Sequence, residues 1–591
     1  MARKTAKRAR VFHGAWMVLA VIVLGVVIVI RIRLLGIPLE RDEGEYAYAG
    51  QLMLQGIPPY KLAYNMKFPG TYAAYAVIMA IFGQTIAGIH LGLLLVNLAT
   101  ITLIFFLGRR LFDSATGLIA AVTYAILSVN PSVLGLAAHV EHFVMVPVLG
   151  GTLLLLGPQG NSGFGSALQR AAVSSPPLFL QLFLGGLLFG IGLLMKQPAI
   201  WFILFGAIYV LAGGRRHLGL QWKTVILRNF IFGAGAVLPF AIACLLLWRA
   251  GVFDKFWFWT IDYARQYGSL ASLGMGFRAL AVNGTLVIGS AWALLTLAAI
   301  GLAAGLWHKP MRAGTGFVLA LFAFSVLAVS AGFYFREHYF ILILPAVSLL
   351  SGVAIRRFSD LVAARGGAIR FAPFVVFCAA LSQPILAARK FYFEDSPIEA
   401  CLASYGLSPF AESVRIAEYL RDHSSPSDTI VVLGSEPQIY FYSRRHSATG
   451  YIYTYGLMEP QSYARQMQEE MIREIELARP KYVVSVKMST SWLRRPESES
   501  LIFTWANRLH QKVLRCRRPG EYSPDGPNRL LSWGITQIPP ATGKLCFDLP
   551  TKILANHRAA TKALAQKPPV SCHRARNKRI SVAMCNKTLT R

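Results

Sequence analysis

Two adjacent carboxylates, Asp42 and Glu43, are the residues of this sequence best suited to acid–base chemistry. They follow the first long apolar run by about a dozen residues, so we expect them at the edge of a membrane. In a helix, Asp42 and Tyr46 would share one face. A carboxylate placed there could deprotonate a hydroxyl group, which typically accelerates a reaction by about 10²–10⁴-fold. A solvated acidic turn is the alternative, and the residues alone do not say which carboxylate would be the base.

Fixed cations near the same edge could bind a phosphate and stabilise charge that develops on it. Lys196 is the first candidate, because it falls between two apolar runs and a charge among membrane helices is costly. Further candidates for holding a phosphate, a sugar or an acceptor are Lys67, Glu141, His142, Arg336 and His338. Each has a plain alternative as a snorkelling lysine, a helix cap or a solvated helix start.

The segment 252–269 is rich in aromatic residues and holds Lys255 and Arg265. Aromatic side chains form belts at membrane interfaces, so the segment could anchor the chain there. Alternatively it could be a lid over a lipid substrate, with Arg265 in contact with that substrate.

The sequence lacks the motifs that bind several kinds of cofactor and partner. It has no glycine-rich loop of the Walker or dinucleotide type, and no cysteine pair with metal-type spacing. Asp42 and Glu43 could bind a divalent ion, but no cluster of metal ligands supports this, so we expect no required cofactor. The formal net charge of +31 comes without an aromatic–basic stripe, so we expect no nucleic-acid partner.

The elements that must position these residues are membrane helices. Of 591 residues, 55% are hydrophobic and only 15% are charged, and the apolar residues form runs of about 20. Eleven spans are predicted, at 11–31, 87–107, 115–131, 136–156, 177–195, 197–213, 228–248, 280–304, 313–332, 338–354 and 371–388. The stretch 72–82 is shorter and predicts a helix in the interface. The fold class is therefore a mainly α membrane protein.

Loop charges predict the orientation. With the N-terminus inside, the cytoplasmic segments hold mostly Lys and Arg, with Asp113 and Asp360 as their acids, whereas the outer segments mix both signs. This basic bias favours a cytoplasmic N-terminus. Eleven crossings then place everything after about residue 390 on the outer side of the membrane. The predicted spans 177–195 and 197–213 decide this placement, because counting them as one broken span would reverse it.

The chain changes character after residue 390. Residues 411–423 and 461–478 have helical periodicity, and 429–433, 437–442 and 481–487 read as strands. We therefore predict a membrane domain at 1–390, with its acidic outer loop at 32–86, and an extracytoplasmic α/β domain at 391–548. The residues 549–591 form a basic tail without hydrophobic periodicity and are expected to be disordered.

A family resemblance enters through the first outer loop. RDEGEYAYAGQLMLQGIPPY followed by KFPGTYAAY resembles the first loop of the dolichyl-phosphate-mannose–protein mannosyltransferase-like family, glycosyltransferase family 39, and of the related aminoarabinose transferases. Similar motifs follow in order at 139–156, 192–201, 337–352 and 428–457, so the resemblance covers about 10–490. One departure is Lys67-Phe68-Pro69, where the family has Lys-Pro or His-Pro.

This resemblance implies a GT-C bundle in which an acidic residue of the first outer loop is the general base. It implies transfer of one sugar, with inversion, from polyprenyl phosphate (dolichyl or undecaprenyl) to a hydroxyl of a protein, lipid or polysaccharide. It also adds Tyr339 to the substrate-binding candidates and makes independence from metal the expectation. The expected location is the bacterial inner (plasma) membrane.

Two other classes of function account for the same composition. A lipid or sugar flippase would show internal repeats or paired broken helices near the middle of the bilayer. A non-catalytic scaffold for envelope assembly would use the α/β domain and the tail as binding modules. Neither the sugar nor the acceptor can be identified from the sequence, because fold does not determine substrate.

Overall fold

The structure is a computed structural model of the 591-residue chain. It describes residues 2–157, 176–214, 220–363, 365, 367–406, 408–515 and 533–537. Met1–Ile538 forms one compact unit. The predicted basic tail at 549–591 lies outside the described residues.

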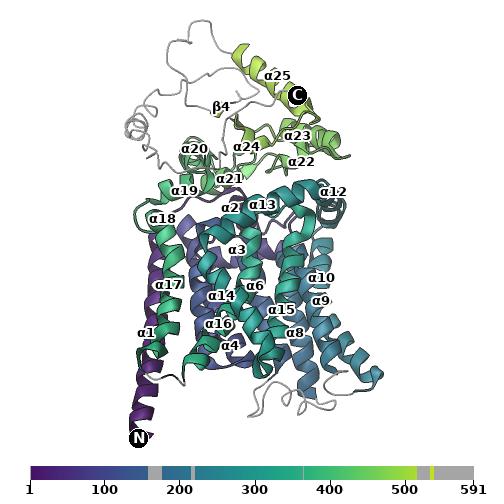
Figure 1. The fold of residues 1–591 in the computed structure, drawn as a ribbon. Helices are drawn as coiled ribbons and strands as arrows, with labels where there is room; N and C mark the ends of the chain where they lie inside the picture. The colour runs from purple at the N-terminus through teal and green to yellow at the C-terminus, as the bar shows by residue number, and fades with distance from the viewer. Residues whose placement is uncertain are drawn as a thin grey trace. The chain divides into compact units, whose positions relative to one another are not determined.

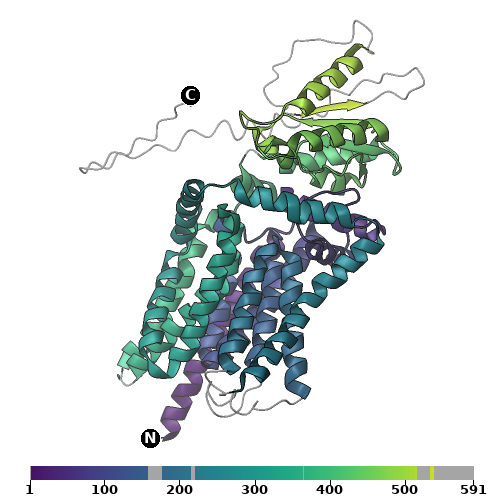
Figure 2. The same ribbon diagram turned by 90° about the vertical axis from the view of Figure 1, so that its right-hand side faces the viewer.

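A bundle of long apolar helices makes up the N-terminal part of the first unit (Figures 1 and 2). Its α-helices are α1 (Ala2–Arg33), α2 (Arg41–Leu54), α3 (Pro69–Phe82), α4 (Ile86–Leu111), α5 (Ser114–Leu127), α6 (Val140–Leu156), α8 (Pro176–Met195), α9 (Ile200–Ala212), α10 (Trp222–Arg249), α11 (Phe253–Trp257), α12 (Ala264–Ser269), α13 (Leu273–Ser290), α14 (Trp292–Trp307), α15 (Lys309–Ser330), α16 (Leu344–Ala363) and α17 (Ala372–Ala387). Short 3₁₀ and π segments join them: η1 (Pro131–Val133), η2 (Gln197–Ala199), η4 (Phe258–Tyr263), η5 (Ala331–Phe333), η6 (Glu337–Ile343) and η7 (Gly367–Phe371).

The chain is an integral membrane protein that crosses the bilayer several times. Among the described residues, seven helices are long and apolar enough to span a membrane, or up to eight if a bent pair counts as one span. Seven of the predicted spans coincide with these helices. The predicted spans 115–131, 136–156 and 197–213 correspond to shorter apolar helices of 10–17 residues.

One predicted span, 280–304, is wrong. The structure has two helices there, α13 and α14, which meet at Ala291. In Figure 1, α13 lies across the upper end of the bundle, whereas α14 runs along it. Side chains from distant segments stabilise the break, because the Ser290 carbonyl accepts a hydrogen bond from Gln383 and the Ser290 hydroxyl accepts one from Asn130. The run 280–304 contains no proline and no charged residue that would mark this break in the sequence.

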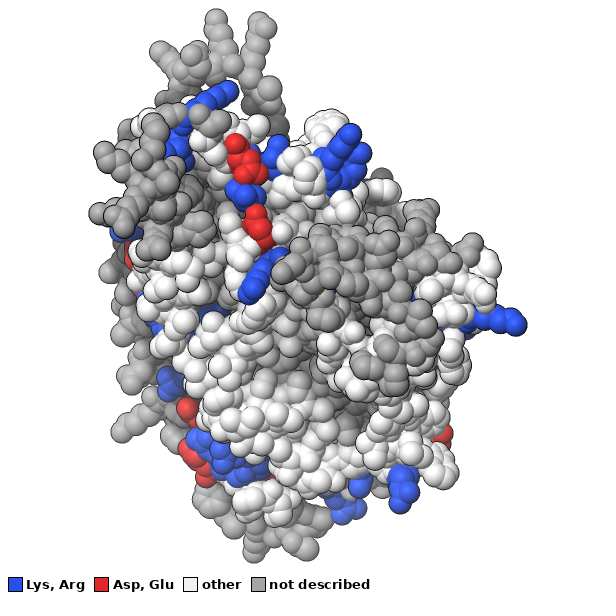
Figure 3. All heavy atoms as spheres, turned by 90° about the horizontal axis from the view of Figure 1, so that it is seen from below, with Lys and Arg blue, Asp and Glu red and all other residues white. Residues whose placement is uncertain are grey.

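The end of the bundle that carries the N-terminus is basic. Seen from that end, Lys and Arg side chains are more numerous than Asp and Glu on the described part of the surface (Figure 3). The middle of this face shows mostly uncharged side chains. A predominance of Lys and Arg is typical of the cytoplasmic side of membrane proteins.

A small α/β region follows the bundle. Its elements are α18 (Arg389–Phe393), α19 (Pro397–Tyr405), α20 (Phe410–Asp422), β1 (Thr429–Leu433), α21 (Gln438–Ser443), β2 (His446–Ser447), α22 (Tyr455–Met458), α23 (Ala464–Ala478), β3 (Tyr482–Val486), α24 (Ser489–Trp492), α25 (Leu501–Arg515) and β4 (Trp533–Gln537). The sheet order is β2-β1-β3-β4. The β1 strand pairs in parallel with β2 and β3, and β4 is antiparallel to β3.

Alternate side chains of β1 enter two different clusters, as a strand requires. Ile430 and Val432 pack with residues of α20 and α21, whereas Val431 and Leu433 pack with residues of α23. Both faces of the central strand are therefore buried, which is typical of parallel pairing. The predicted helices and strands at 411–423, 429–433, 461–478 and 481–487 are confirmed.

The predicted strand at 437–442 is wrong, because these residues begin the helix α21. Pro437 is the N-cap of this helix and already has helical backbone angles. Since Gln438 is the one strongly polar residue of this short segment, periodicity cannot separate a buried helix from a strand. The helix matters for the site because it packs directly on α2. A Cβ at Gly44 would lie 2.6 Å from Gln438, so only glycine allows this approach.

Candidate functional site

The acidic motif begins helix α2, which lies where the bundle meets the α/β region (Figure 1). A capping box fixes its start: Glu43 N donates to Glu40 Oε1, and Glu40 N donates to Glu43 Oε2. Arg41 donates to the Ser435 carbonyl at 2.7 Å and pairs with Glu436 at 3.2 Å. The first turn of α2 is therefore held from both sides, so Asp42 and Tyr46 lie in a buried helix and the alternative of a solvated acidic turn is wrong.

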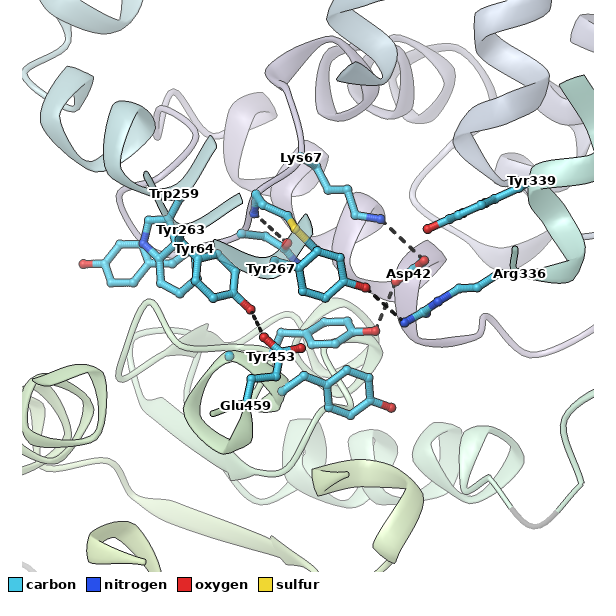
Figure 4. A pocket seen from close by; sticks show the side chains of 14 residues that line it. Asp42, Tyr64, Lys67, Trp259, Tyr263, Tyr267, Arg336, Tyr339, Tyr453 and Glu459 are labelled. Carbon is cyan, nitrogen blue, oxygen red and sulfur yellow. Dashed lines mark hydrogen bonds and ion pairs between the residues drawn. The ribbon is translucent and has the colours of Figure 1, made fainter. Parts of the chain in front are cut away.

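Asp42 faces a pocket (Figure 4), and the side chains of Lys67, Arg336 and Tyr453 converge on it. Its Oδ2 lies 3.6 Å from Lys67 Nζ, and its Oδ1 accepts a hydrogen bond of 3.2 Å from the Tyr453 hydroxyl. Burial raises the pKa of Asp42, but the positive charges of Lys67 and Arg336 outweigh burial and hold this pKa below its usual value. Asp42 is thus a buried carboxylate that stays ionised.

Glu43 faces the opposite way and is fully engaged. Its Oε1 lies 3.1 Å from His90 Nε2 and accepts a hydrogen bond of 2.6 Å from the Ala138 amide. Burial raises the pKa of Glu43, but His90 outweighs it and holds the pKa below its usual value. These contacts join α2 to α4 and to the segment before α6, so Glu43 has a structural position.

The bundle and the α/β region build the pocket together. Its lining residues from the bundle are Asp42, Tyr64, Asn65, Met66, Lys67, Trp259, Tyr263, Tyr267, Arg336 and Tyr339, and those from the α/β region are Tyr453, Tyr455, Gly456 and Glu459. The cavity volume is about 50 Å³, which is room for a few water molecules. Aromatic walls with a few convergent polar groups are typical of small-molecule sites.

Two of the predicted cations, Lys67 and Arg336, lie in this pocket. Lys67 Nζ donates to the Tyr46 hydroxyl at 3.0 Å, and Arg336 Nη2 donates to the Tyr267 hydroxyl at 3.4 Å. Burial lowers the pKa of Lys67, but the nearby carboxylates outweigh it and raise this pKa above its usual value. The pocket therefore has permanent positive charge on both sides of Asp42.

Lys196 lies behind this pocket and is already paired. Its ammonium group forms an ion pair with the fully buried Glu141 and lies 3.6 Å from the centre of the Tyr339 ring. His338 Nε2 is 4.0 Å from Glu141 Oε1. Four of the predicted site residues, from three different segments, therefore form one buried cluster next to the pocket.

The structure separates two predicted site residues from the others. Arg265, on α12, is exposed and does not line the pocket. His142 is buried, but neither ring nitrogen has a hydrogen-bond partner among the described residues, and it does not line the pocket.

Three side chains could hold a metal ion: Asp42, His139 and His338. Their ligand atoms lie within 4.8 Å of one another. The two imidazole rings stack 4.0 Å apart, and both nitrogens of His139 have no hydrogen-bond partner among the described residues. The donor types therefore fit a divalent ion. The charge of Lys67 beside Asp42 opposes a second cation there.

Sequence reasoning missed the pocket residues of the α/β region, Tyr453, Tyr455 and Glu459, because they are about 400 residues from Asp42 in the sequence. It also missed His139, which lies two residues before the predicted Glu141 and could have been found in the HVEH motif. The aromatic segment 252–269 was noted, and it supplies Trp259, Tyr263 and Tyr267 to the pocket wall.

Comparisons with known proteins give matches for the structure alone. No family model matches the chain, and no curated protein does. The crystal structure of ArnT from Cupriavidus metallidurans in the apo state matches with a TM-score of 0.52 and 16% identity, over 80% of this chain and 93% of that one. The Archaeoglobus fulgidus oligosaccharyltransferase complex with Zn and sulfate matches with a TM-score of 0.50 and 15% identity, over 80% and 68%. ArnT bound to undecaprenyl phosphate matches with a TM-score of 0.49 and 17% identity, over 80% and 93%.

The first two of these matches show the fold. The chain has a GT-C-like fold, which it shares with membrane glycosyltransferases. At this level of identity, membership of the mannosyltransferase-like family stays a prediction.

Proposed function

We propose that this protein is a membrane glycosyltransferase that moves one sugar from a polyprenyl phosphate to a hydroxyl acceptor. The observation that carries the proposal is the position of Asp42. It is buried, stays ionised, and lies in an aromatic-lined pocket next to Lys67 and Arg336. The GT-C-like fold supports the same class of reaction.

In this proposal, Lys67 and Arg336 bind the phosphate of the donor. Both are charged, both line the pocket, and they approach Asp42 from different segments. Phosphate recognition by such cations is common, and it stabilises the charge that grows on the leaving group. Lys196 lies behind these two cations, and its charge is paired with Glu141. Tyr339 lines the pocket, and its ring lies next to the Lys196 ammonium group.

The reaction is a single displacement. The acceptor oxygen attacks the anomeric carbon, the bond from that carbon to the phosphate oxygen breaks, and polyprenyl phosphate leaves with the bonding electrons. The acceptor proton goes to an oxygen of Asp42, which acts as general base. Attack from the side opposite the phosphate inverts the anomeric configuration. We assign the base to Asp42 because Glu43 is engaged by His90 and the Ala138 amide.

The finer topology belongs to the same proposal. Eleven crossings in the bacterial inner membrane, with α14 in place of the predicted span 280–304, would place the N-terminus inside and the α/β domain, 391–548, outside. The basic end of the bundle at the N-terminus supports this orientation (Figure 3). Donor and acceptor then meet on the extracytoplasmic face, at the end of the bundle that carries α2.

We propose further that transfer needs no metal ion. Lys67 and Arg336 already supply the positive charge that a divalent ion would supply to a phosphate. If an ion binds, Asp42, His139 and His338 are its ligands, and it occupies the carboxylate that we assign as base. Transfer should therefore continue in excess EDTA, and a requirement for added Mg²⁺, Mn²⁺ or Zn²⁺ would contradict this part of the proposal.

The experiment that tests the proposed function measures transfer by the purified full-length protein in nanodiscs. Radiolabelled polyprenyl-phosphate sugars serve as donors and total envelope extract as acceptor, with Asp42→Asn beside wild type. We expect a labelled product with wild type and none with the variant, and the product identifies the acceptor. If no donor gives transfer although a donor binds, a flippase or a scaffold becomes the better assignment.

A further inference from the structure

We infer that Tyr453, in the α/β region, is a positioning residue for Asp42, so that the two parts of the chain complete one site. This inference rests on the proposed function and deepens it. The α/β region would then be part of the catalytic apparatus, in addition to any contact that it makes with the acceptor.

The contact itself is direct. The Tyr453 hydroxyl donates to Asp42 Oδ1 at 3.2 Å, while Oδ2 lies toward Lys67 (Figure 4). Among the described residues, the Tyr453 hydroxyl is the group that donates a hydrogen bond to the Asp42 carboxylate. A hydrogen bond on one oxygen fixes the rotation of the carboxylate plane, which leaves the other oxygen in a defined direction. General-base catalysis depends on that direction, because a small misplacement of a reacting group lowers the rate strongly.

A second set of contacts holds the loop that carries Tyr453. Glu474, on α23, accepts hydrogen bonds from the Tyr64 hydroxyl at 3.0 Å, the Thr449 hydroxyl at 2.6 Å and the Gly450 amide at 3.0 Å. The Tyr64 amide donates to the Gly450 carbonyl at 2.7 Å. We call these four residues the Glu474 clamp.

The clamp joins the two loops that flank Asp42. Tyr64 is three residues before Lys67, and Gly450 is three residues before Tyr453. The loops lie so close that a Cβ at Gly450 would be 2.3 Å from the Tyr64 ring. Each loop therefore fixes the position of the other, and with it the positions from which Lys67 and Tyr453 reach Asp42.

The test compares Tyr453→Phe with Tyr451→Phe in the full-length protein in nanodiscs. Tyr451 is in the same loop, but its hydroxyl donates to Glu470 and does not line the pocket. We expect Tyr453→Phe to lower kcat by about tenfold to a hundredfold, the range for a hydrogen bond to a charged group. Its KM for the donor should stay within about twofold of wild type, because Lys67 and Arg336 remain. Tyr451→Phe should keep both constants.

A double-mutant cycle separates positioning from a general structural effect. In an Asp42→Glu background the carboxylate is already displaced, so adding Tyr453→Phe should change kcat by less than about twofold. Unchanged kcat in the single variant, or an equal loss in both backgrounds, would overturn the inference while the proposed function stands. If wild type itself transfers no sugar, the proposed function fails and this inference fails with it.

Discussion

Asp42 and Glu43 are neighbours in the sequence but belong to two different regions of the molecule. Asp42 faces the pocket, where its partners are two long cations and a hydroxyl from the α/β region. Glu43 faces the bundle, where His90, the Ala138 amide and the Glu40 amide occupy it. Both are buried, and both have a pKa below the usual value of their type.

The difference lies in what each carboxylate can still do. Successive residues of an α-helix point about 100° apart, so one position separates the pocket face of α2 from its packing face. Glu43 has no oxygen free of short contacts, and its loss would leave buried partners unpaired. Asp42 has one hydrogen bond and one longer ion pair, so a substrate hydroxyl can still approach it. A lowered pKa alone therefore does not identify a catalytic acid or base.

Exchanging each carboxylate for its amide tests the difference between Asp42 and Glu43 most directly. Asp42→Asn should lower kcat by about 10²–10⁴-fold, the usual contribution of a general base. Glu43→Gln, measured in the same assay and normalised to folded protein, should keep kcat within about threefold of wild type. The thermal melting curve of each variant serves as the control for folding. A larger loss of kcat in Glu43→Gln than in Asp42→Asn would reverse the assignment.

The sequence could predict the membrane class, most of the spans and the acidic loop, because these follow from local patterns. Apolar runs report burial in lipid directly, and the strand at 429–433 is marked by its β-branched residues. It could not predict the break at Ala291 or the helix at Gln438–Ser443. Both depend on contacts with distant segments, and such contacts leave no local signal.

The same limit applies to the site. Lys67 lies close to Asp42 in the sequence and was a candidate from the start, and Arg336 was found from its place at the end of a span. Tyr453 and Glu459 could not be found in this way, because neither lies close to Asp42 in the sequence or at the end of a predicted membrane span. Lys196 shows the opposite case: its position made it the first candidate for binding a phosphate, whereas in the structure its ammonium group is paired with Glu141.

The next largest effect is expected for the cations on the pocket side. Lys67→Gln and Arg336→Gln should each raise the KM for the donor by about tenfold to a hundredfold, since a hydrogen bond to a charged group is worth about 1.5–3 kcal/mol. Steady-state kinetics with a fixed acceptor and varied donor measure this. Arg265→Gln is the matched control, because Arg265 is exposed and does not line the pocket. Equal effects of all three substitutions would show that general surface charge, and not the pocket, governs donor binding.

On the bundle side, the comparison predicts a loss of stability without a loss of chemistry. Glu43→Ala leaves the Ala138 amide and His90 without their acceptor, and an unsatisfied buried group costs about 1–3 kcal/mol. The melting temperature of the protein in nanodiscs should therefore fall, while kcat per folded molecule stays within a few-fold. Asp42→Ala should lower the melting temperature less. Should Asp42→Ala prove the more destabilising of the two, the structural assignment of Glu43 would fail.

The smallest expected effect concerns pH. Glu459 lines the pocket, and its carboxylate accepts a hydrogen bond of 2.6 Å from Tyr263. Burial raises the pKa of Glu459 to about 7, although the Tyr263 hydrogen bond and the charges of Arg495 and Arg336 oppose the rise. Glu459 is therefore mainly neutral at pH 6 and mainly ionised at pH 8. Asp42 stays ionised over this range, because its pKa is lowered.

Ionisation of Glu459 adds a negative charge to the pocket that we assign to the donor phosphate. Donor binding should therefore weaken by about two- to fivefold between pH 6 and pH 8, and Glu459→Gln should remove this dependence. Binding of the sugar phosphodiester is the right measurement, since a phosphodiester does not titrate in this range, whereas the phosphate monoester product has a pKa near 6. If binding tightens as the pH rises, or if the glutamine variant keeps the wild-type profile, Glu459 is not the titrating group. The pH response of the pocket would then have to come from a residue that lies outside it.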